Sequence, residues 1–399
     1  MVGHVDHGKT TLTKALSGTW TDTHSEEMKR GISIKLGYAD TAFYGTKDGR
    51  YYAKGKHPDG SEDIDKELLR SVSFVDAPGH ETLMAVMISG ASIMDGALLL
   101  VSATESCPQP QTREHLAALE IAGIGNIVIV QNKIDIVTRE RAIESHREIQ
   151  NFVEGTIAEG SPIIPVSAHH DVNLDILIQA IEETIPTPMR PKNEKGLMYV
   201  ARSFDINRPG TRPNNLKGGI IGGSVVEGSF SVGDKILIAP GRRIKEGNKT
   251  YWKPLETTIE SAQGGGLDLQ TIHAGGLCGI ATPMDPVSTK ADELSGQVMA
   301  KEGELPPVWE EFKVDLELLK FMVSGGDDGP SKVRPLQPNE MLMINSATTT
   351  SVGTVSTIKG KKAGIKLRLP ICAKEGSRIT LSRRIGTRWR LIGHGSITG

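Results

Sequence analysis

The sequence has 399 residues, a length that suits two to four domains, each able to bury a core of its own. Its net charge of −2, with 24% charged and 4% aromatic residues, is that of an ordinary globular protein. The three cysteines are far apart and lack C-x-x-C spacing, which argues against a disulfide framework or a zinc cluster and favours a reducing compartment. No apolar run approaches a membrane span and no signal peptide precedes the first motif, so we expect a cytoplasmic protein.

Residues 3–10 read G-H-V-D-H-G-K-T and match the phosphate-binding pattern G-x-x-x-x-G-K-[ST]. Gly3 and Gly8 let the backbone curl so that successive N–H groups point at phosphate oxygens. Lys9 can reach the β- and γ-phosphates, and the Thr10 hydroxyl can ligate Mg²⁺. The next six residues are expected to be helical, which turns the positive end of a helix dipole towards the same phosphates. A glycine-containing turn can match by chance, so the assignment depends on partner motifs.

A second motif supplies the acidic residue that a nucleoside triphosphatase needs near Mg²⁺. A short, largely apolar strand ends at Asp76, whose carboxylate can hold the ion through water. The residues that follow complete a D-x-P-G-H switch, in which the Gly79 N–H can meet the γ-phosphate and His80 can orient the attacking water. An Asp-Pro-Gly segment alone is an ordinary turn signal. Its place after a phosphate loop favours the functional interpretation.

A third motif, N-K-I-D, follows a buried-type strand at residues 127–131. Asp135 can accept hydrogen bonds from the N1–H and the exocyclic amine of guanine, which adenine cannot supply. Asn132 can tie the base edge to the phosphate loop, and the stem of Lys133 can cover the ring.

A fourth motif, S-A-H, ends another apolar strand and comprises Ser167, Ala168 and His169. A backbone N–H of this segment can meet guanine O6, and Ser167 can in addition cap a helix. Because four motifs occur in one order at suitable spacings, the sequence predicts that the nucleotide is GTP.

The pattern of predicted secondary structure changes near residue 185. Before it, apolar strands alternate with helical segments at 111–121, 139–154 and 174–184, as a doubly wound, mostly parallel sheet requires. A proline-rich linker at 185–192 follows, and beyond it short strands are separated by glycine-rich turns. We therefore predict an α/β P-loop GTPase domain at 1–190 and two strand-rich domains, barrels or sandwiches, at 191–304 and 305–399.

The overall charge conceals an asymmetry. Residues 359–399 carry eleven Lys and Arg against one acid, Glu375, so this stretch is +10 and the remainder is −12. Such a split suggests that the C-terminal region meets a polyanion, and RNA is the polyanion we expect. The alternative is a solvated face on a strand-rich domain.

Together these motifs and R-G-I-S-I at residues 30–34 resemble the translational GTPases. Within that group, five runs resemble the gamma-subunit family of translation initiation factor 2: residues 76–84, 90–97, 108–116, 305–309 and 389–393. The likeness runs nearly end to end. Asp6 in the phosphate loop and the lack of eukaryote-type extensions resemble the archaeal members.

The resemblance implies a GTPase domain followed by two all-β barrel domains. It also implies a GTP-dependent carrier that hydrolyses GTP to GDP and phosphate. In the GTP state it would hold methionylated initiator tRNA, deliver it to the small ribosomal subunit and release it after hydrolysis. The family works as a heterotrimer with alpha and beta subunits. No arginine finger is identifiable, so we expect slow intrinsic turnover that a partner or the ribosome raises.

By motif, the resemblance also implies two metal positions. Thr10 and Ser33 would ligate the catalytic Mg²⁺ directly and Asp76 through water, and a second Mg²⁺ would lie at Asp6 and the backbone of Gly31. Hydrolysis would depend on His80 and Lys9, with Val5 and Ile32 forming a hydrophobic gate beside His80. The full set of expected nucleotide contacts is Gly3, Val5, Asp6, His7, Gly8, Lys9, Thr10, Thr11, Gly79, Asn132, Lys133, Asp135, Ser167, Ala168 and His169.

Three departures from the family pattern carry expectations of their own. Ser33 stands where Thr is common, and its hydroxyl should still ligate Mg²⁺. Residues 45–67 contain no cysteine where many members carry a zinc knuckle, so we expect no zinc there. Only Met1 and Val2 precede Gly3, so the first strand is expected to be shortened: either the sequence is a fragment, or the chain loses substantial core pairing.

Two alternative functions stay open. One is an elongation-factor-type GTPase that delivers elongator aminoacyl-tRNA, although elongation factors resemble D-C-P-G-H where this sequence has D-A-P-G-H. The other is a GTP-gated scaffold for protein partners that binds no RNA. A steep fall of RNA affinity with salt would distinguish the carrier from the scaffold.

Overall fold

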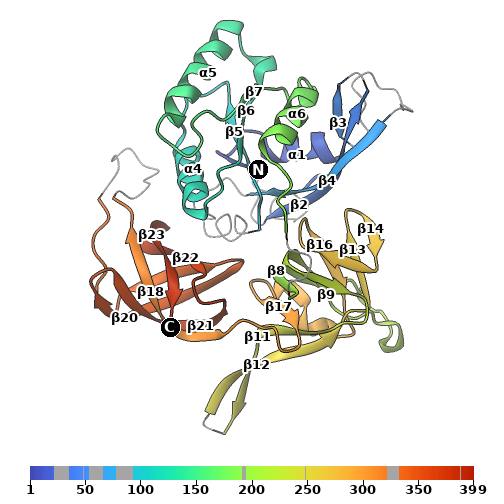
Figure 1. The fold of residues 1–399 in the computed structure, drawn as a ribbon, viewed down its shortest axis with the longest axis vertical. Coiled ribbons are helices and arrows are strands. Elements are labelled where there is room, and N and C mark those ends of the chain that lie inside the picture. The colour runs from blue at the N-terminus through green and yellow to red at the C-terminus, as the bar shows by residue number, and fades with distance from the viewer. Residues whose placement is uncertain are drawn as a thin grey trace. The chain divides into compact units, whose positions relative to one another are not determined.

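The computed structural model describes residues 1–21, 36–47, 49–53, 66–77, 93–190, 195–247, 249–320, 332–386 and 388–399. The chain divides into two compact units, the first covering residues 1–188 and the second beginning at residue 189. Figure 1 gives the element labels. Within the described residues, no helix is both long and apolar enough to cross a membrane.

The first unit contains a parallel sheet with strand order β1-β5-β6-β7. Its strands are β1 (Val2–Gly3), β5 (Ala97–Ser102), β6 (Ile127–Asn132) and β7 (Ile163–Pro165), and its helices are α1 (Lys9–Ser17), α4 (Pro110–Ala122), α5 (Arg139–Val153) and α6 (Leu174–Thr184). Every residue of β5 and β6 is buried, as in a sheet covered on both faces. The predicted α/β GTPase fold is confirmed, and α6 has the predicted bounds.

An antiparallel sheet with strand order β3-β2-β4 completes the first unit. Its strands are β2 (Gly37–Thr46), β3 (Tyr51–Ala53) and β4 (Lys66–Asp76). Met1 links the two sheets, because its amino group donates to the carbonyl of Val75 at 2.6 Å and its carbonyl accepts from the N–H of Ala77 at 3.1 Å. Although β1 has only two residues, its segment is hydrogen-bonded on both sides.

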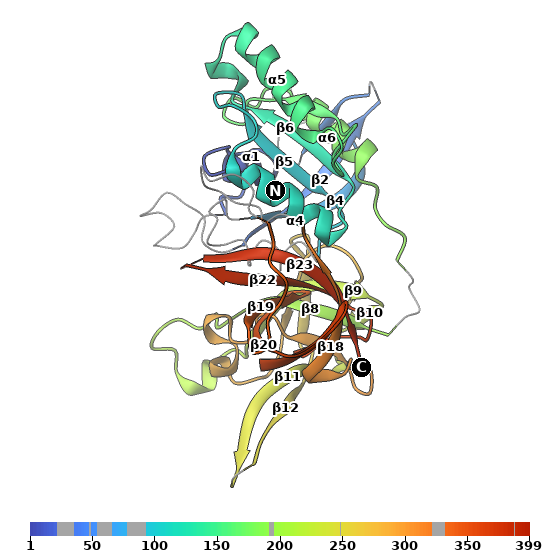
Figure 2. The ribbon, with the colours of Figure 1, turned by 90° about the vertical axis from the view of Figure 1, so that its left-hand side faces the viewer.

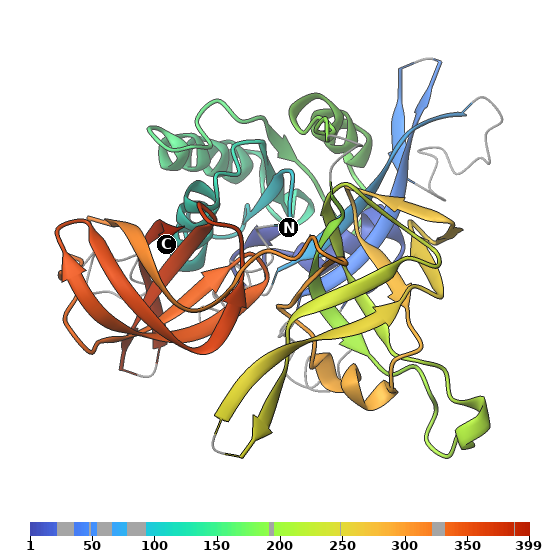
Figure 3. The same ribbon diagram turned by 60° about the horizontal axis from the view of Figure 1, so that its bottom comes forward.

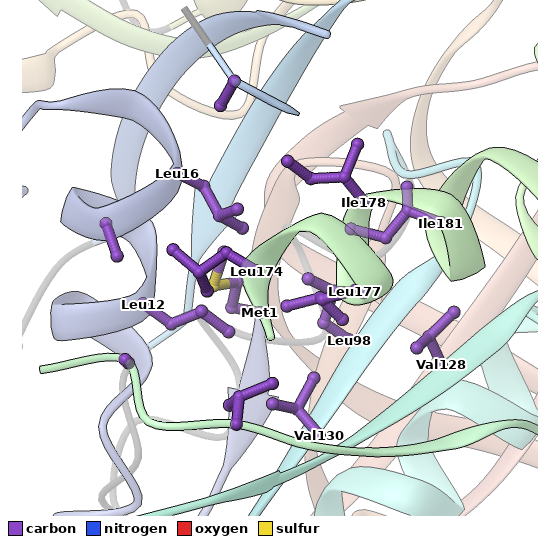
Figure 4. Packing of buried hydrophobic residues seen from close by; sticks show 14 of the residues in the cluster. Met1, Leu12, Leu16, Leu98, Val128, Val130, Leu174, Leu177, Ile178 and Ile181 are labelled. Carbon is purple, nitrogen blue, oxygen red and sulfur yellow. The ribbon is translucent and has the colours of Figure 1, made fainter. Parts of the chain in front are cut away.

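The core of the first unit lies between the parallel sheet, α1 and α6 (Figure 4). Leu98, Val128 and Val130 point from β5 and β6 towards Leu12 of α1 and Leu177 of α6, and all five are at least 96% buried. Burying a leucine or valine side chain contributes about 1.5–3 kcal/mol, so this layer fixes α1 and the loop before it.

The second unit is all-β, as predicted. Its first part pairs as an antiparallel sheet of order β12-β11-β17-β8-β9-β16-β13-β14, with a separate pair β10-β15. The strands are β8 (Leu197–Phe204), β9 (Ile220–Glu227), β10 (Ser229–Ser231), β11 (Lys235–Glu246), β12 (Lys249–Thr258), β13 (Ser261–Gly264), β14 (Leu267–Leu269), β15 (Thr271–His273), β16 (Cys278–Ala281) and β17 (Val298–Lys301). Buried side chains from both sheets, among them Phe230 and Ile280, share one core.

The remaining strands form a closed barrel of order β18-β21-β20-β19-β22-β23. They are β18 (Val308–Leu318), β19 (Met341–Ser346), β20 (Thr349–Lys359), β21 (Lys362–Cys372), β22 (Arg378–Ile385) and β23 (Arg388–Thr398). Cys372 of the barrel packs in one apolar cluster with Leu197, Ala239 and Val298 of the preceding sheet. This cluster accounts for the two β regions forming one compact unit.

Candidate nucleotide-binding site

The phosphate loop connects β1 to α1, and its backbone requires glycine at both ends. Gly3 has φ 141° and Gly8 has φ 90°, a region that residues with a side chain rarely adopt. A Cβ on Gly8 would also overlap the side-chain amide of Asn132. Gly8 is the N-terminal cap residue of α1, and its carbonyl accepts from the N–H of Leu12 at 2.9 Å. The loop therefore presents the N-terminus of a helix, the usual position for a phosphate.

The Lys9 side chain lies inside the arch of this loop. Its Nζ donates to the carbonyls of Gly3 at 3.1 Å and His4 at 2.7 Å, and the residue is 5% exposed. The positive charge is therefore held next to the loop backbone, where phosphate oxygens would lie.

Two side chains of α4 hold the first half of the loop. The N–H of Gly3 donates to Nδ1 of His115 at 2.8 Å, and the N–H of Val5 donates to Oε1 of Gln111 at 3.4 Å. Burial lowers the pKa of His115 to about 3, so its ring is neutral and can accept this bond. Sequence reasoning did not identify these two residues. Spacing gave a signal for His115, since Thr112, His115, Leu116 and Leu119 recur at helical intervals on the buried face.

His7 fixes the middle of the loop. Its Nδ1 bonds the carbonyl of Leu100 at 2.8 Å, and its Nε2 lies 3.5 Å from the carboxylate of Glu105. The residue is fully buried, and burial lowers its pKa to about 4. Because a ring nitrogen facing a carbonyl must carry the proton, Nδ1 is the donor. Groups of the protein itself therefore hold the middle of the loop.

The hydroxyl and the carboxylate predicted to hold Mg²⁺ are brought together. Oγ1 of Thr10 donates to Oδ2 of Asp76 at 2.7 Å, and Oγ1 of Thr21 donates to the same oxygen at 2.7 Å. Asp76 is 1% exposed, and its Oδ1 has no hydrogen-bond partner among the described residues. A buried carboxylate oxygen without a donor beside a hydroxyl is a donor set that suits a hard cation such as Mg²⁺. The residues present therefore fit the ion.

The residues predicted to read the base converge near the ends of β6 and β7. Asn132 links the motifs: its Nδ2 donates to the carbonyl of His7 at 2.9 Å, and its Oδ1 accepts from the N–H of Ala168 at 3.1 Å. A hydrogen bond from Ser167 lowers the pKa of Asp135, and Nε2 of His170 lies 3.6 Å from the same carboxylate. An ionised carboxylate therefore lies where the sequence predicts an acceptor for a guanine edge.

The remaining predicted residues fall into three groups. Asp6 and Lys133 have left-handed backbones, with φ of 61° and 63°, and Thr11 lies in the first turn of α1. Ser167 does not cap α6, because Asn173 occupies that position. Gly31, Ile32, Ser33, Gly79 and His80 lie outside the described residues. The roles assigned to these five stay predictions.

Comparisons with known proteins identify the family of this chain. The family described as "Elongation factor Tu GTP binding domain" matches residues 1–187, and "Initiation factor eIF2 gamma, C terminal" matches residues 310–397. "Translation initiation factor 2 subunit gamma" of Methanocaldococcus jannaschii is 54% identical over all of this chain and 96% of its own length. The protein of the same name from Methanothermobacter thermautotrophicus is 55% identical, over all of this chain and 97% of its own length.

This chain belongs to the gamma-subunit family of translation initiation factor 2. It is accordingly a GTP-binding subunit of a translation initiation factor and a GTPase. The sequence prediction of this family, of GTP and of GTP hydrolysis is confirmed. The family also implies an initiation-factor complex that contains other subunits.

Solved structures agree on the fold. "Crystal structure of bacterial selenocysteine-specific elongation factor EF-Sec" superimposes with a TM-score of 0.74 at 24% identity, covering 99% of this chain and 57% of that one. Elongation factor SelB from Methanococcus maripaludis, in complex with the GTP analogue GppNHp, gives a TM-score of 0.70 at 21% identity, covering 100% of this chain and 78% of that one. At such identities the likeness concerns the fold alone.

Proposed function

We propose that this chain binds methionylated initiator tRNA in its GTP state, delivers it to the small ribosomal subunit and releases it after GTP hydrolysis. The observation that carries the proposal is the likeness to "Translation initiation factor 2 subunit gamma" over the whole chain, at 54% and 55% identity. The alpha and beta subunits of the same factor are its proposed protein partners, and the cytoplasm is its proposed location. The proposed domains are residues 1–190, 191–304 and 305–399.

Mg²⁺ is the proposed companion of GTP. Thr10 and Ser33 would ligate it and Asp76 would act through water, while Asp6 and the backbone of Gly31 would hold a second ion. The short contact between Thr10 and the buried Asp76 carboxylate supports the first position. A bound Mg²⁺ would neutralise charge that develops on the transferred phosphoryl group. The chain itself supplies the loop N–H groups and Lys9, and His80 would orient water within the gate of Val5 and Ile32.

The C-terminal basic stretch is proposed to contact RNA. Some of its eleven cations are engaged within the protein: Arg383 is buried against Glu340, and Lys374 pairs with Glu227. Lys359, Lys361 and Lys362 are exposed at the β20–β21 turn. These three lysines are therefore the first residues to test for a contact with phosphates.

Binding of fluorescent methionyl-initiator tRNA and of an elongator aminoacyl-tRNA, each with GTP and with GDP, tests the carrier function. The proposal predicts tight binding of the initiator tRNA with GTP only, with an affinity that falls steeply as salt rises. Equal affinity for the two tRNAs would favour an elongation-factor-type carrier. No RNA binding at low salt would favour a GTP-gated protein scaffold.

A further inference from the structure

The β11–β12 hairpin continues past the rest of its sheet as a two-stranded ribbon. β11 pairs with β17 only from Ile236 to Ala239, whereas its ladder with β12 continues from Arg242 to Glu246. We call residues 242–247 and 249–253 the ribbon. The ribbon extends away from the other strands of the second unit in Figures 1, 2 and 3.

The ribbon is strongly basic in a chain that is slightly acidic overall. Residues 242–253 contain five basic residues and one acid, a net charge of +4, against −2 for the whole sequence. The exposed members on the described ribbon are Arg242, Arg243, Lys245 and Lys253. In the part of the chain that the structure describes, none of these four is in an ion pair.

The one acidic residue of the ribbon is hydrogen-bonded within the ribbon itself. Glu246 forms a hydrogen bond with the hydroxyl of Tyr251, and this bond raises the pKa of Tyr251. Tyr251 is 38% exposed, so its ring stays accessible. The ribbon thus offers cations and an aromatic ring to a partner.

Cross-strand register places a cation beside an aromatic ring on one face of the ribbon. Arg243 is directly opposite Trp252, so both side chains leave the same face, and Lys245 follows on that face two residues along. In an extended strand the Cα atoms of those two residues are about 6.6–6.8 Å apart, close to the spacing of successive phosphates along a nucleic acid strand. The other face carries Ile244 opposite Tyr251.

We propose that the ribbon is a docking element for ribosomal RNA of the small subunit. Arg243 and Lys245 contact its phosphates, and an unpaired base stacks on an aromatic ring of the ribbon. The inference rests on the proposed function, which brings this chain to that subunit. Cations interleaved with aromatic rings suit RNA better than a protein, because both phosphates and base faces find a partner.

Ribosomal RNA is favoured over the tRNA cargo because of how the ribbon is built. A cargo contact must weaken when GTP is hydrolysed. Beyond Gly241 the ladder of the ribbon involves β11 and β12 alone, so its backbone pairing gives no route by which the nucleotide could alter it. A contact with the small ribosomal subunit, on which the carrier docks, does not have to change with the nucleotide.

The test uses the full chain with GTP and purified small ribosomal subunits of an archaeon. In co-sedimentation at low salt, R243E/K245E should bind these subunits at least about tenfold more weakly than the wild type, and R243Q/K245Q by a smaller factor. Loss of two phosphate contacts should also reduce the slope of log affinity against log salt by about 1.4. The matched control is R139E/R147E, which makes the same charge change on the exposed face of α5.

Each other outcome overturns the inference. Unchanged subunit binding by R243E/K245E, or an equal loss in the α5 control, excludes a specific contact at the ribbon. If the variant loses affinity only for initiator tRNA, the ribbon is a site for the cargo. If it loses affinity only for the alpha or beta subunit, the ribbon is a protein interface.

The proposed function fails separately. It fails if wild-type protein does not bind initiator tRNA with GTP, a measurement made without ribosomal subunits. Unchanged melting of the ribbon variants shows that they fold, so a loss of subunit binding reports on contact and not on stability.

Discussion

The backbone N–H of Gly3 donates to Nδ1 of His115 at 2.8 Å, which ties the start of the phosphate loop to a helix more than a hundred residues later in the sequence. This N–H would otherwise be a buried donor without a partner, at a cost of about 1–3 kcal/mol. Substitution His115→Leu should therefore weaken GTP binding by about tenfold or more, since about 1.4 kcal/mol is a factor of ten. Titration with a fluorescent GTP analogue measures this.

The control for His115 is His115→Gln, whose side-chain oxygen can still accept from Gly3 and should restore part of the affinity. His146→Leu on α5 removes a histidine away from the loop and should leave affinity unchanged. Equal loss in the Leu and Gln variants would show that the acceptor does not matter.

Acid should destabilise the first unit through its buried histidines. Burial lowers the pKa of His115 to about 3 and that of His7 to about 4, against about 6.5 for an unfolded chain. Between those values the unfolded chain binds more protons than the folded chain. The contribution of these histidines to the free energy of unfolding is therefore fully present above about pH 6.5 and falls as pH falls below it. One such group contributes at most about 1.4 kcal/mol per pH unit.

Urea unfolding between pH 7 and pH 4.5 checks this dependence. The signal is the fluorescence of Trp20 in a variant whose other three tryptophans are phenylalanine, because Trp20 alone lies in the first unit. His115→Gln should have a shallower pH dependence than the parent. Identical slopes would mean that His115 does not titrate on unfolding.

Asn132 should be more important for stability than a surface asparagine. It is 3% exposed and satisfies both the carbonyl of His7 and the N–H of Ala168. Asn132→Ala leaves two buried groups unpaired, so we expect a loss of about 2–5 kcal/mol, together with weaker GTP binding. The same Trp20 signal measures it, and the exposed Asn126→Ala is the control, with an expected change within about 0.5 kcal/mol.

Asp135 should decide which base is bound. Asp135→Asn removes the acceptor for the guanine N1–H and amine, so GTP affinity should fall by about 100-fold or more. Xanthosine triphosphate, which presents an oxygen where guanine has an amine, should then bind better than GTP. Competition of both nucleotides against a fluorescent GTP analogue measures this, and unchanged GTP affinity would show that Asp135 does not read the base.

A buried ion pair should hold the C-terminal barrel. Arg383 is 5% exposed; it pairs with Glu340 and donates to the carbonyl of Arg334 at 2.9 Å. Arg383→Ala leaves Glu340 and the carbonyl of Arg334 without a cation, so the free energy of unfolding of the second unit should fall by about 3–5 kcal/mol. Hydrogen–deuterium exchange of β22 and β19 reports this. Arg384→Ala, at the exposed neighbouring position, should change little.

The sequence by itself determined the ligand and the family. Each of the four motifs lies within a short stretch of chain, because a phosphate loop or a strand end is a local structure. Its glycine, lysine, threonine, aspartate or asparagine residues can therefore be recognised without the fold. The apolar periods gave α6 its bounds and placed β6 within one residue. Strand length and turn composition likewise predicted the parallel sheet and a strand-rich region that is a barrel or a sandwich, whereas the resemblance to the family indicated barrels.

Only the tertiary structure decided what holds those motifs together. His115, Gln111 and Glu105 reach the loop from segments about a hundred residues away, and no local pattern shows which atoms then meet. The ribbon likewise depends on where β17 stops pairing with β11, a matter of sheet register. The tertiary structure also reduced the number of C-terminal cations available to RNA, because Arg383 is buried beside Glu340. Composition counts charges along the chain, whereas packing decides which of them remain in water.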